Sequence, residues 1–249
     1  MCRQSTSGIA LETTLLVSNC AEMRLFIIPA KLLCSPIPES GGAFRVSVYS
    51  PYVILNKTGL DIMVKSKSLL QSAKAAAGQV QSGEFPISIM FENSSNIQTG
   101  SGPRQNPTPY MFSFPSDDGQ NRAVLKVGDS NWSKPQSFEA IGSSSEVVLT
   151  SASNTSEEIH IGIYVEEGRG KYKMSKIVTL TPRFIIKSRL SEEIHVREWA
   201  SPNIMPLKPG DLLPLYFMKA GYEKQFRLSF PGPDNNWCSH AFPLVAACY

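Results

Sequence analysis

The stretch SVYSPYVILNKTGLDIMV, from Ser47 to Val64, decides the fold. It contains an apolar run at Tyr52–Leu55, a polar corner at Asn56–Gly59 and a second apolar segment that ends at Val64. A short, continuous apolar run between turn residues is typical of a strand that is buried on both faces. Asn and Gly suit the corner, because both tolerate the backbone conformations of tight turns. The stretch therefore predicts two β-strands joined by a short corner.

A similar pattern returns as TLTPRFIIKSRLSEEIHV, from Thr179 to Val196. When Pro51 is aligned with Arg183, apolar residues match apolar residues and polar residues match polar residues. The matched pairs are Tyr52 with Phe184, Val53 with Ile185, Ile54 with Ile186, Asn56 with Ser188, Ile62 with Ile194 and Val64 with Val196. The landmarks S-F-P and D-x-N-W follow both copies in the same order, at Ser113–Pro115 and Asp129–Trp132, and at Ser229–Pro231 and Asp234–Trp237. This recurrence predicts an internal repeat of about a hundred residues or more, as in modular arrays.

Each repeat is predicted to be a small β-sandwich that docks on its neighbours, so that contacts between neighbours supply much of the stability. Residues 1–41 then form the tail of a preceding repeat or an irregular N-terminal segment. Residues 42–169 form a first complete repeat, and residues 170–249 form a second, truncated repeat. We expect the chain to be a fragment of a longer array or a truncated gene product.

The periodicity of other segments supports an all-β fold of tandem, antiparallel β-sandwich repeats. Apolar and polar residues alternate at Phe44–Val48, Ile159–Val165 and Phe226–Phe230, and a period of two is typical of half-buried strands. One short helix is predicted at Ser68–Ala77, whose Leu and Ala residues share one side. The polar, Gly- and Pro-rich segment Asn93–Pro109 has no period and predicts a long mobile loop.

Composition argues against several classes of protein. The formal net charge is only +3, and the Lys and Arg residues are scattered without interleaved aromatic residues, which argues against nucleic-acid binding. The five cysteines are odd in number and include no CxxC pair, so we expect reduced thiols rather than a disulfide framework or a zinc site. No apolar run reaches the roughly 20 residues of a membrane-spanning helix.

No motif predicts catalysis, a cofactor or a metal. His160, His195 and His240 lie far apart in the sequence and lack the spacing that places two ligands on one face. The chain contains no G-x-S-x-G elbow and no P-loop. Its paired acidic residues fit charged turns better than an acid/base pair held at a fixed distance. We therefore expect a protein that is not an enzyme and that uses no cofactor.

The strand pair SPYVILNKTGLDI, the segment KIVTLTPRFIIKSRLSEEIHVREWAS and the run WSKPQSFE resemble the vacuolar protein sorting-associated protein thirteen family. These are chorein-type, bridge-like lipid transfer proteins, and the resemblance is to their adaptor-binding module, which is also described as a region like a SHORT-ROOT-binding domain. The resemblance covers Gly41 to Trp237. The chorein lipid groove lies outside this region, so we do not expect the chain itself to carry lipid.

The resemblance implies an array of β-sandwich repeats that binds proline-x-proline peptides of organelle adaptor proteins. Binding would recruit the lipid-transfer rod to membrane contact sites and would serve vacuolar and endosomal protein sorting. The implied location is cytoplasmic, peripheral on endosome, vacuole and mitochondrial contact sites, with membrane association through the adaptors. The expected mechanism is the addition of an extended peptide strand to an exposed sheet edge, with a pocket for prolines.

Three residues are candidates for this function. Asn56 matches an Asn that repeats of this family commonly carry after the first apolar strand, where a buried amide would act as a polar pin for the array; an ordinary turn Asn is the alternative. Trp199 and Arg197 are candidate peptide contacts. Trp199 qualifies because exposed aromatic residues can stack on prolines. Alternatively, Arg197 belongs to a solvated charged corner of little energetic weight. The recurring Trp132 and Trp237 are expected in the cores of their own repeats.

Two alternative functions remain open. The first is a β-module that binds a membrane surface or lipid headgroups, and the second is a purely structural spacer of the rod. The second copy also departs from the family pattern, since Ser188 and Arg189 stand where an Asn is expected.

Overall fold

The computed structural model describes residues 10–18, 25–37, 41, 44–68, 89–90, 109–114, 121–153, 156–232 and 236–244. Within these ranges the regular structure is β-strand except for one 3-10 turn, η1 (Gly170–Tyr172), which confirms the all-β fold. Ser68, the first residue of the expected helix, ends a strand, and residues 69–77 lie outside the described residues. The same holds for residues 93–108 of the expected mobile loop.

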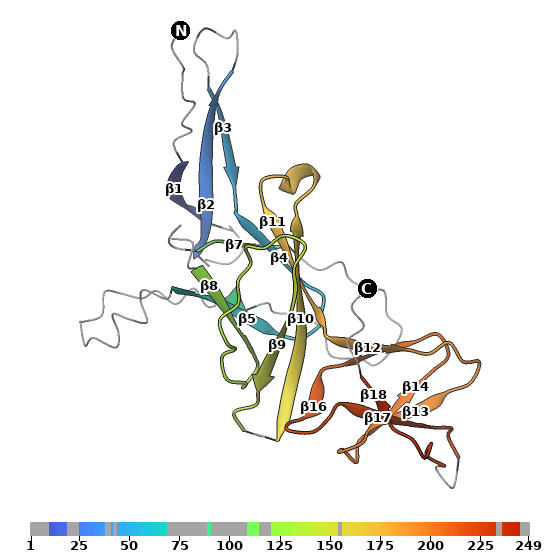
Figure 1. Cartoon of the computed structure of the whole chain (residues 1–249). Coiled ribbons are helices and arrows are strands. Elements are labelled where there is room, and N and C mark those ends of the chain that lie inside the picture. Colours follow the sequence, from blue (N-terminus) through green and yellow to red (C-terminus); the bar gives the residue numbers. More distant parts are fainter. Residues whose placement is uncertain are drawn as a thin grey trace, which may run out of the picture.

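A three-stranded antiparallel sheet in the order β1-β2-β3 stands at the N-terminal end. Its strands are β1 (Ala10–Ser18), β2 (Leu25–Pro36) and β3 (Phe44–Tyr49). Figure 1 shows this sheet projecting as an arm from the rest of the molecule. The chain then passes through Ser50 and Pro51 directly into the first strand of the stretch that predicts the fold.

The first unit, which we define as β4 to β11, contains two facing sheets, one of which is extended by β16 from the second unit. One sheet has the order β16-β10-β11-β4-β7, with β9 also paired to β10, and the other has the order β6-β5-β8. Their strands are β4 (Tyr52–Asn56), β5 (Ile62–Ser68), β6 (Ile89–Met90), β7 (Tyr110–Phe112), β8 (Asn121–Val127), β9 (Ser144–Thr150), β10 (Glu157–Glu167), β11 (Lys176–Pro182) and β16 (Phe217–Lys219).

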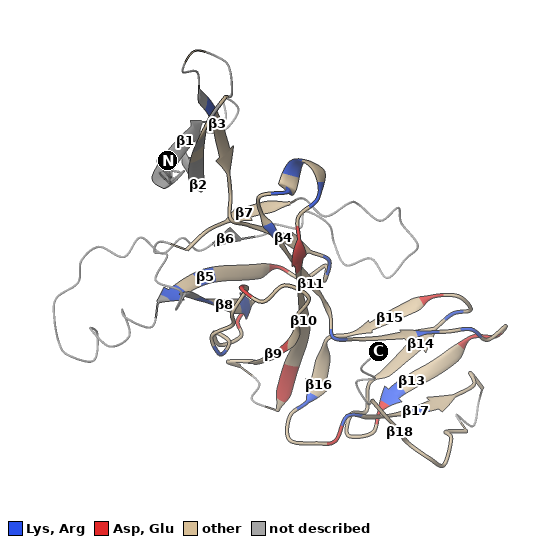
Figure 2. Ribbon diagram, turned by 45° about the horizontal axis from the view of Figure 1, so that its top comes forward, with Lys and Arg blue, Asp and Glu red and all other residues tan. Residues whose placement is uncertain are grey.

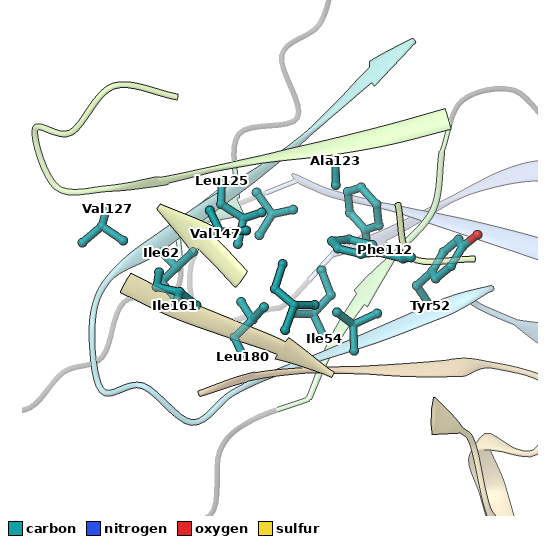
Figure 3. Close-up of a cluster of buried hydrophobic side chains, with 14 of the residues drawn as sticks. Tyr52, Ile54, Ile62, Phe112, Ala123, Leu125, Val127, Val147, Ile161 and Leu180 are labelled. Carbon is teal, nitrogen blue, oxygen red and sulfur yellow. The ribbon is translucent and has the colours of Figure 1, made fainter. Parts of the chain in front are cut away.

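The apolar side chains of both sheets meet in one core. Figure 3 shows this cluster, whose labelled members are Tyr52, Ile54, Ile62, Phe112, Ala123, Leu125, Val127, Val147, Ile161 and Leu180. Edge-to-face contacts join the rings at one end, with centroids 5.3 Å apart for Tyr52 and Phe114 and 5.1 Å apart for Phe112 and Phe114, a favoured aromatic geometry. Val53, on the opposite face of β4, is also buried. Burial on both faces explains the continuous apolar run in the sequence.

The second unit, defined as β12 to β18, contains a four-stranded sheet in the order β14-β13-β17-β18 and a two-stranded sheet, β12-β15. These strands are β12 (Phe184–Lys187), β13 (Ile194–Glu198), β14 (Ile204–Leu207), β15 (Leu212–Leu215), β17 (Gln225–Ser229) and β18 (Phe242–Pro243). Its buried core consists of Ile194, Val196, Leu207, Leu215, Met218 and Phe226.

The two units share one pattern of strand pairing. In the first, β4 pairs with β7 while β5 lies between β6 and β8; in the second, β12 pairs with β15 while β13 lies between β14 and β17. The match extends to single bonds, because Ser133 N donates to the Leu125 carbonyl and Cys238 N donates to the Leu228 carbonyl, both at 2.8 Å. The internal repeat of the sequence is therefore also a repeat of structure.

One of the sequence matches is wrong. Ser113 follows β7, which pairs with β4, whereas Ser229 ends β17, which pairs with β13. The two S-F-P landmarks thus belong to different places in the sandwich, and the counterpart of β17 is β8.

The strand pairing also bears on the division of the chain into repeats. A boundary at residue 170 would separate β10 from β11, although β11 pairs with β10 and, in parallel, with β4. In the same way, β3 pairs with β2 of the N-terminal arm. The arm strands β1-β2-β3 and the strands β9-β10-β11 are both antiparallel meanders that lead directly into the first strand of a unit. We propose boundaries after Tyr49 and after Pro182 in place of those at 41 and 169.

Candidate functional site

β12 is the counterpart of β4, but it is paired on one edge only. β4 has β7 on one side and β11, in parallel, on the other. β12 has β15 on one side, and no strand within the described ranges pairs with its other edge. A free edge presents unpaired backbone N–H and C=O groups and acts as a template for another strand. In the order of the repeat, β9–β11 follow Trp132, whereas the described residues of the second unit end at Leu244, soon after Trp237. The edge of β12 that is open in this part of the chain is the first candidate binding site.

The hydrogen bonds of β12 show which of its N–H groups face the free edge. Ser188 N donates to the Asp211 carbonyl on the β15 side at 3.1 Å. Successive N–H groups of a strand point to opposite sides. The N–H groups of Ile185 and Lys187 therefore point to the free edge. The side chains of both residues are exposed.

Asn56 lies at the corner between β4 and β5 and is buried. Its Nδ2 donates to the Leu60 carbonyl at 2.8 Å, and its Oδ1 accepts bonds from Thr58 N at 3.1 Å and from Thr58 Oγ1 at 2.6 Å. Leu60 N then donates to Thr58 Oγ1 at 3.1 Å. The amide thus satisfies the backbone of a closed, buried corner, as expected for buried polar groups.

Ser188 holds the matching corner of the second unit and is also buried. Leu190 N donates to its Oγ at 3.4 Å, the counterpart of the bond from Thr58 N to Asn56. Serine has no amide group for the bond that Asn56 makes across the corner to Leu60. The corner at Ser188 therefore keeps the bond from the N–H group two residues later and lacks the bond across the corner that Asn56 makes to Leu60.

The corner held by Asn56 also contacts the second unit. The hydroxyl of Tyr216 donates to the Thr58 carbonyl, and burial raises the pKa of Tyr216 above its ordinary value. Beside it, β16 pairs with β10 of the first unit, while Met218 of β16 packs in the core of the second. Lys224 Nζ lies 3.1 Å from Glu158 Oε2 of β10. These contacts join the two units.

Arg197 of β13 and Trp199, which directly follows β13, lie on the side opposite the core, because they alternate with the buried Val196 and Glu198. Arg197 Cζ lies 4.4 Å from the centroid of the Trp237 ring. Trp199 is exposed, and Arg227 Cζ lies 3.6 Å from its ring centroid. The structure thus brings Arg197 and Trp199 onto one surface, whereas Asn56 belongs to the other unit.

The expectation that the recurring tryptophans fill the cores of their repeats is wrong, because Trp132 is exposed and Trp237 is not a member of the second core. Glu198, next to Arg197, is buried and accepts a bond from Lys219 N at 2.9 Å.

Sequence reasoning missed Arg227, which pairs with Arg197 across β13 and β17. Its place in the alternating segment Phe226–Phe230 showed that it faces away from the core. The strand partner that makes it part of a site follows only from the register.

The described residues show no metal-binding group of three or more His, Cys, Asp or Glu residues. In the same part of the chain, no helix has the length and apolar character needed to cross a membrane. Cys238, whose side chain is described, is free and exposed. In Figure 2, Lys and Arg positions are spread over both units among acidic ones.

The paired sandwich units, the joint between them and the free strand edge define a tandem β-repeat interaction module. A sequence model described as "Vacuolar-sorting associated protein 13, adaptor binding domain" matches residues 29–244. The chain belongs to this family of adaptor-binding domains of lipid transfer proteins. The family is described by adaptor binding, vacuolar sorting and lipid transfer rather than as an enzyme class.

The similar curated proteins are much longer than this chain. It is 52% identical over 201 residues to the intermembrane lipid transfer protein VPS13 of Chaetomium thermophilum, which covers 81% of this chain and 6% of that protein. It is 28% identical over 151 residues to Vps13D of Drosophila melanogaster, covering 60% and 3%. It is 28% identical over 167 residues to VPS13C of Homo sapiens, covering 67% and 4%.

Proposed function

We propose that the chain is a non-enzymatic adaptor-binding module that captures an extended proline-x-proline peptide at the free edge of β12. The observation that supports the proposal is the edge of β12 that no described strand covers and that matches the edge where β4 accepts β11. The described residues end at Leu244, before the place in the repeat that matches β9–β11. A bound peptide would take the place that β11 has in the first unit. Its backbone would bond to the N–H groups of β12, and its preset polyproline geometry would reduce the entropy lost on binding.

In the whole protein, this capture would recruit a lipid-transfer rod to organelles that display such adaptors. The module would then be cytoplasmic and peripheral on endosome, vacuole or mitochondrial contact sites, and it would act in vacuolar protein sorting. It would touch the membrane indirectly, through its adaptors. The family assignment and the names of its relatives support this proposal.

Calorimetric titration with a blocked proline-x-proline peptide, and with its alanine-x-alanine counterpart, tests the proposal. Ile185→Pro removes an N–H group from the free edge and leaves the β15 side intact, whereas Ile185→Ala keeps the N–H and serves as the control. We expect the Pro variant to bind at least about tenfold more weakly, which corresponds to about 1.4 kcal/mol, and the Ala variant to bind nearly as well as the parent. Equal binding by the Pro variant, or no peptide binding at all, would overturn the assignment to β12.

The alternative of a membrane-surface binder predicts flotation with anionic liposomes and no effect of Ile185→Pro. The scattered charges of Figure 2 supply no continuous basic face for that role. A purely structural spacer would bind neither peptide nor liposome.

A further inference from the structure

A second surface, independent of the free edge of β12, lies on the outer face of the β13–β17 pair. We define the Trp–Arg face as Arg197, Trp199, Arg227, Ser229 and Trp237. These residues form two stacks that cross the strands diagonally: the guanidinium of Arg227 lies against Trp199, and that of Arg197 lies against Trp237. Each guanidinium thus lies within cation–π distance of an indole ring, and Lys lacks the planar group that can stack there.

The two arginines are direct cross-strand neighbours. Like charges in this position destabilise a sheet. Among the described residues, no carboxylate forms an ion pair with Arg197 or Arg227. Glu193 lies 4.0 Å from Nε2 of the neighbouring His195. The hydrogen bond recorded for Arg227 is a long one, from Nη2 to the Ser239 carbonyl at 3.4 Å. Within the part of the chain that the structure describes, the positive charge of the face therefore lacks a counter-charge.

Buried polar atoms on the same face also lack partners. Arg197 Nε, Arg227 Nε, His195 Nδ1 and Ser229 Oγ make no hydrogen bond to any described residue. Ser229 is only 4% exposed. A buried polar group normally has a hydrogen-bond partner, and each exception requires an explanation. Four of the six such atoms in the described part of the chain gather here, around the two arginines, and the other two are His160 Nε2 and Arg183 Nε.

The repeat itself does not require this arrangement. In the first unit the pair that matches Arg197 and Arg227 is Lys65 and Val124, which face each other across β5 and β8. Two residues farther along the same strand pair, Lys67 and Arg122 do face each other, so adjacent cations alone do not distinguish the second unit. What distinguishes it is that both arginines of its pair lie against tryptophan rings.

We propose that the Trp–Arg face binds an acidic, extended segment of a protein partner. Arg197 and Arg227 take its carboxylates through the planar forks that match carboxylate geometry, and the exposed Trp199 packs against the neighbouring residues. Extension is favoured because the face is the surface of a sheet, and alternate side chains of an extended peptide project to one side about 7 Å apart. A membrane surface is disfavoured because the chain carries a net charge of only +3, without a basic patch.

The test uses the full 249-residue chain and a pool of blocked heptapeptides with Glu at the third and fifth positions. The control pool has Gln at the same positions. Calorimetry and tryptophan fluorescence should show saturable binding of the Glu pool that is at least about tenfold tighter than that of the Gln pool. Raising the ionic strength should weaken binding, because exposed charges are screened.

Arg197→Gln and Arg227→Gln should each weaken binding by about tenfold or more. Arg227→Lys should also weaken it, because the charge remains while the planar fork is lost. Arg189→Gln removes an exposed arginine of the β12–β13 corner and should leave the affinity unchanged. Unchanged melting temperatures in the variants would show that the loss is one of binding and not of folding.

Three results would overturn the proposal. Equal affinity for the Glu and Gln pools would show that carboxylates are not recognised. Retained affinity in the arginine variants would place the peptide elsewhere. Binding to phosphatidylserine vesicles or to inorganic phosphate, but to neither pool, would replace the acidic peptide with a headgroup or a free anion. Because the face does not include β12, a failure here leaves the free-edge proposal standing, and the converse also holds.

Discussion

Asn56 shows how one buried amide can determine a corner of the fold. Its side chain bonds both forward to Thr58 and across to the Leu60 carbonyl. These partners are buried within the corner, so water cannot replace the amide without opening the structure. The Thr58 carbonyl on the outside of the same corner accepts the bond from Tyr216, which links the local geometry to the second unit.

Asn56→Ala should lower the free energy of unfolding by about 1–3 kcal/mol, because it leaves buried backbone groups without partners. Asn56→Ser should cost less, since it reproduces the arrangement at Ser188 and keeps the bond to residue 58. Urea unfolding of the two variants and the parent measures this order. A loss below about 0.5 kcal/mol for the Ala variant would show that Asn56 is an ordinary turn residue.

At the scale of the element, the turn between β10 and β11 depends on Gly168. A Cβ atom at this position would lie 1.9 Å from the Tyr172 carbonyl oxygen and 2.6 Å from that of Ser175. Gly168 N itself donates to the Ser175 carbonyl at 2.9 Å. The close approach allows η1 to fit inside the turn and brings β11 back between β10 and β4.

Gly168→Ala should therefore force the turn open and cost about 3 kcal/mol, at the upper end of overpacking effects. Gly170→Ala is the matched control in the same turn, because Gly170 has φ +58° but open space around it, and it should cost only about 1 kcal/mol. Thermal and urea unfolding would compare the two. A Gly168→Ala variant as stable as Gly170→Ala would show that the turn can relax without cost.

The elements show where sequence reasoning succeeds and where it stops. The apolar run at Tyr52–Leu55 and the alternation at Ile159–Val165 predicted strands that the structure contains, because burial on one face or both leaves a direct pattern in the sequence. The parallel pairing of β11 with β4 leaves no such pattern, since it joins segments more than a hundred residues apart. The match between the two S-F-P motifs was wrong for the same reason, because a short sequence motif does not show which strand its residues pair with.

The candidate site could also be predicted only in part, because its residues come from different strands. The sequence named Arg197 and Trp199 as candidate contacts, and the structure shows that they lie on one face. Arg227 and Trp237 complete that face through the pairing of β17 with β13 and a bridge between Ser229 and Trp237. The expectation that tryptophan belongs in the core failed because an indole ring can instead cover a guanidinium at the surface.

At the scale of the whole molecule, β16 makes the two units interdependent. Its backbone extends the first sheet at β10, while Met218 packs in the second core. The hydroxyl of Tyr216 and the ion pair between Lys224 and Glu158 support the same joint. A strand shared in this way couples neighbouring repeats, as in arrays whose stability depends on interfaces between units.

We therefore expect the parent chain to unfold in one transition and the double variant Tyr216→Phe, Lys224→Met to unfold in two. Trp132 reports on the first unit when Trp199 and Trp237 are replaced by Phe, and the converse variant reports on the second. Lys187→Met is the control for removing an exposed lysine away from the joint. Coincident transitions in the double variant would show that the pairing of β16 with β10 couples the units without these two side chains.

Alkaline pH provides a second measure of the same joint. The pKa of Tyr216 is raised by burial above 10.0, so the unfolded chain releases this proton at a lower pH than the folded chain. The stability that the neutral phenol contributes is fully present below pH 10 and is lost as the pH rises through the folded pKa. Tyr110 acts with the same sign in the first unit, because burial raises its pKa to about 12.

Because Tyr216→Phe removes one of these two groups, the parent should lose more stability above pH 10 than Tyr216→Phe does. Equal losses would mean that the ionisation of Tyr216 does not affect the joint.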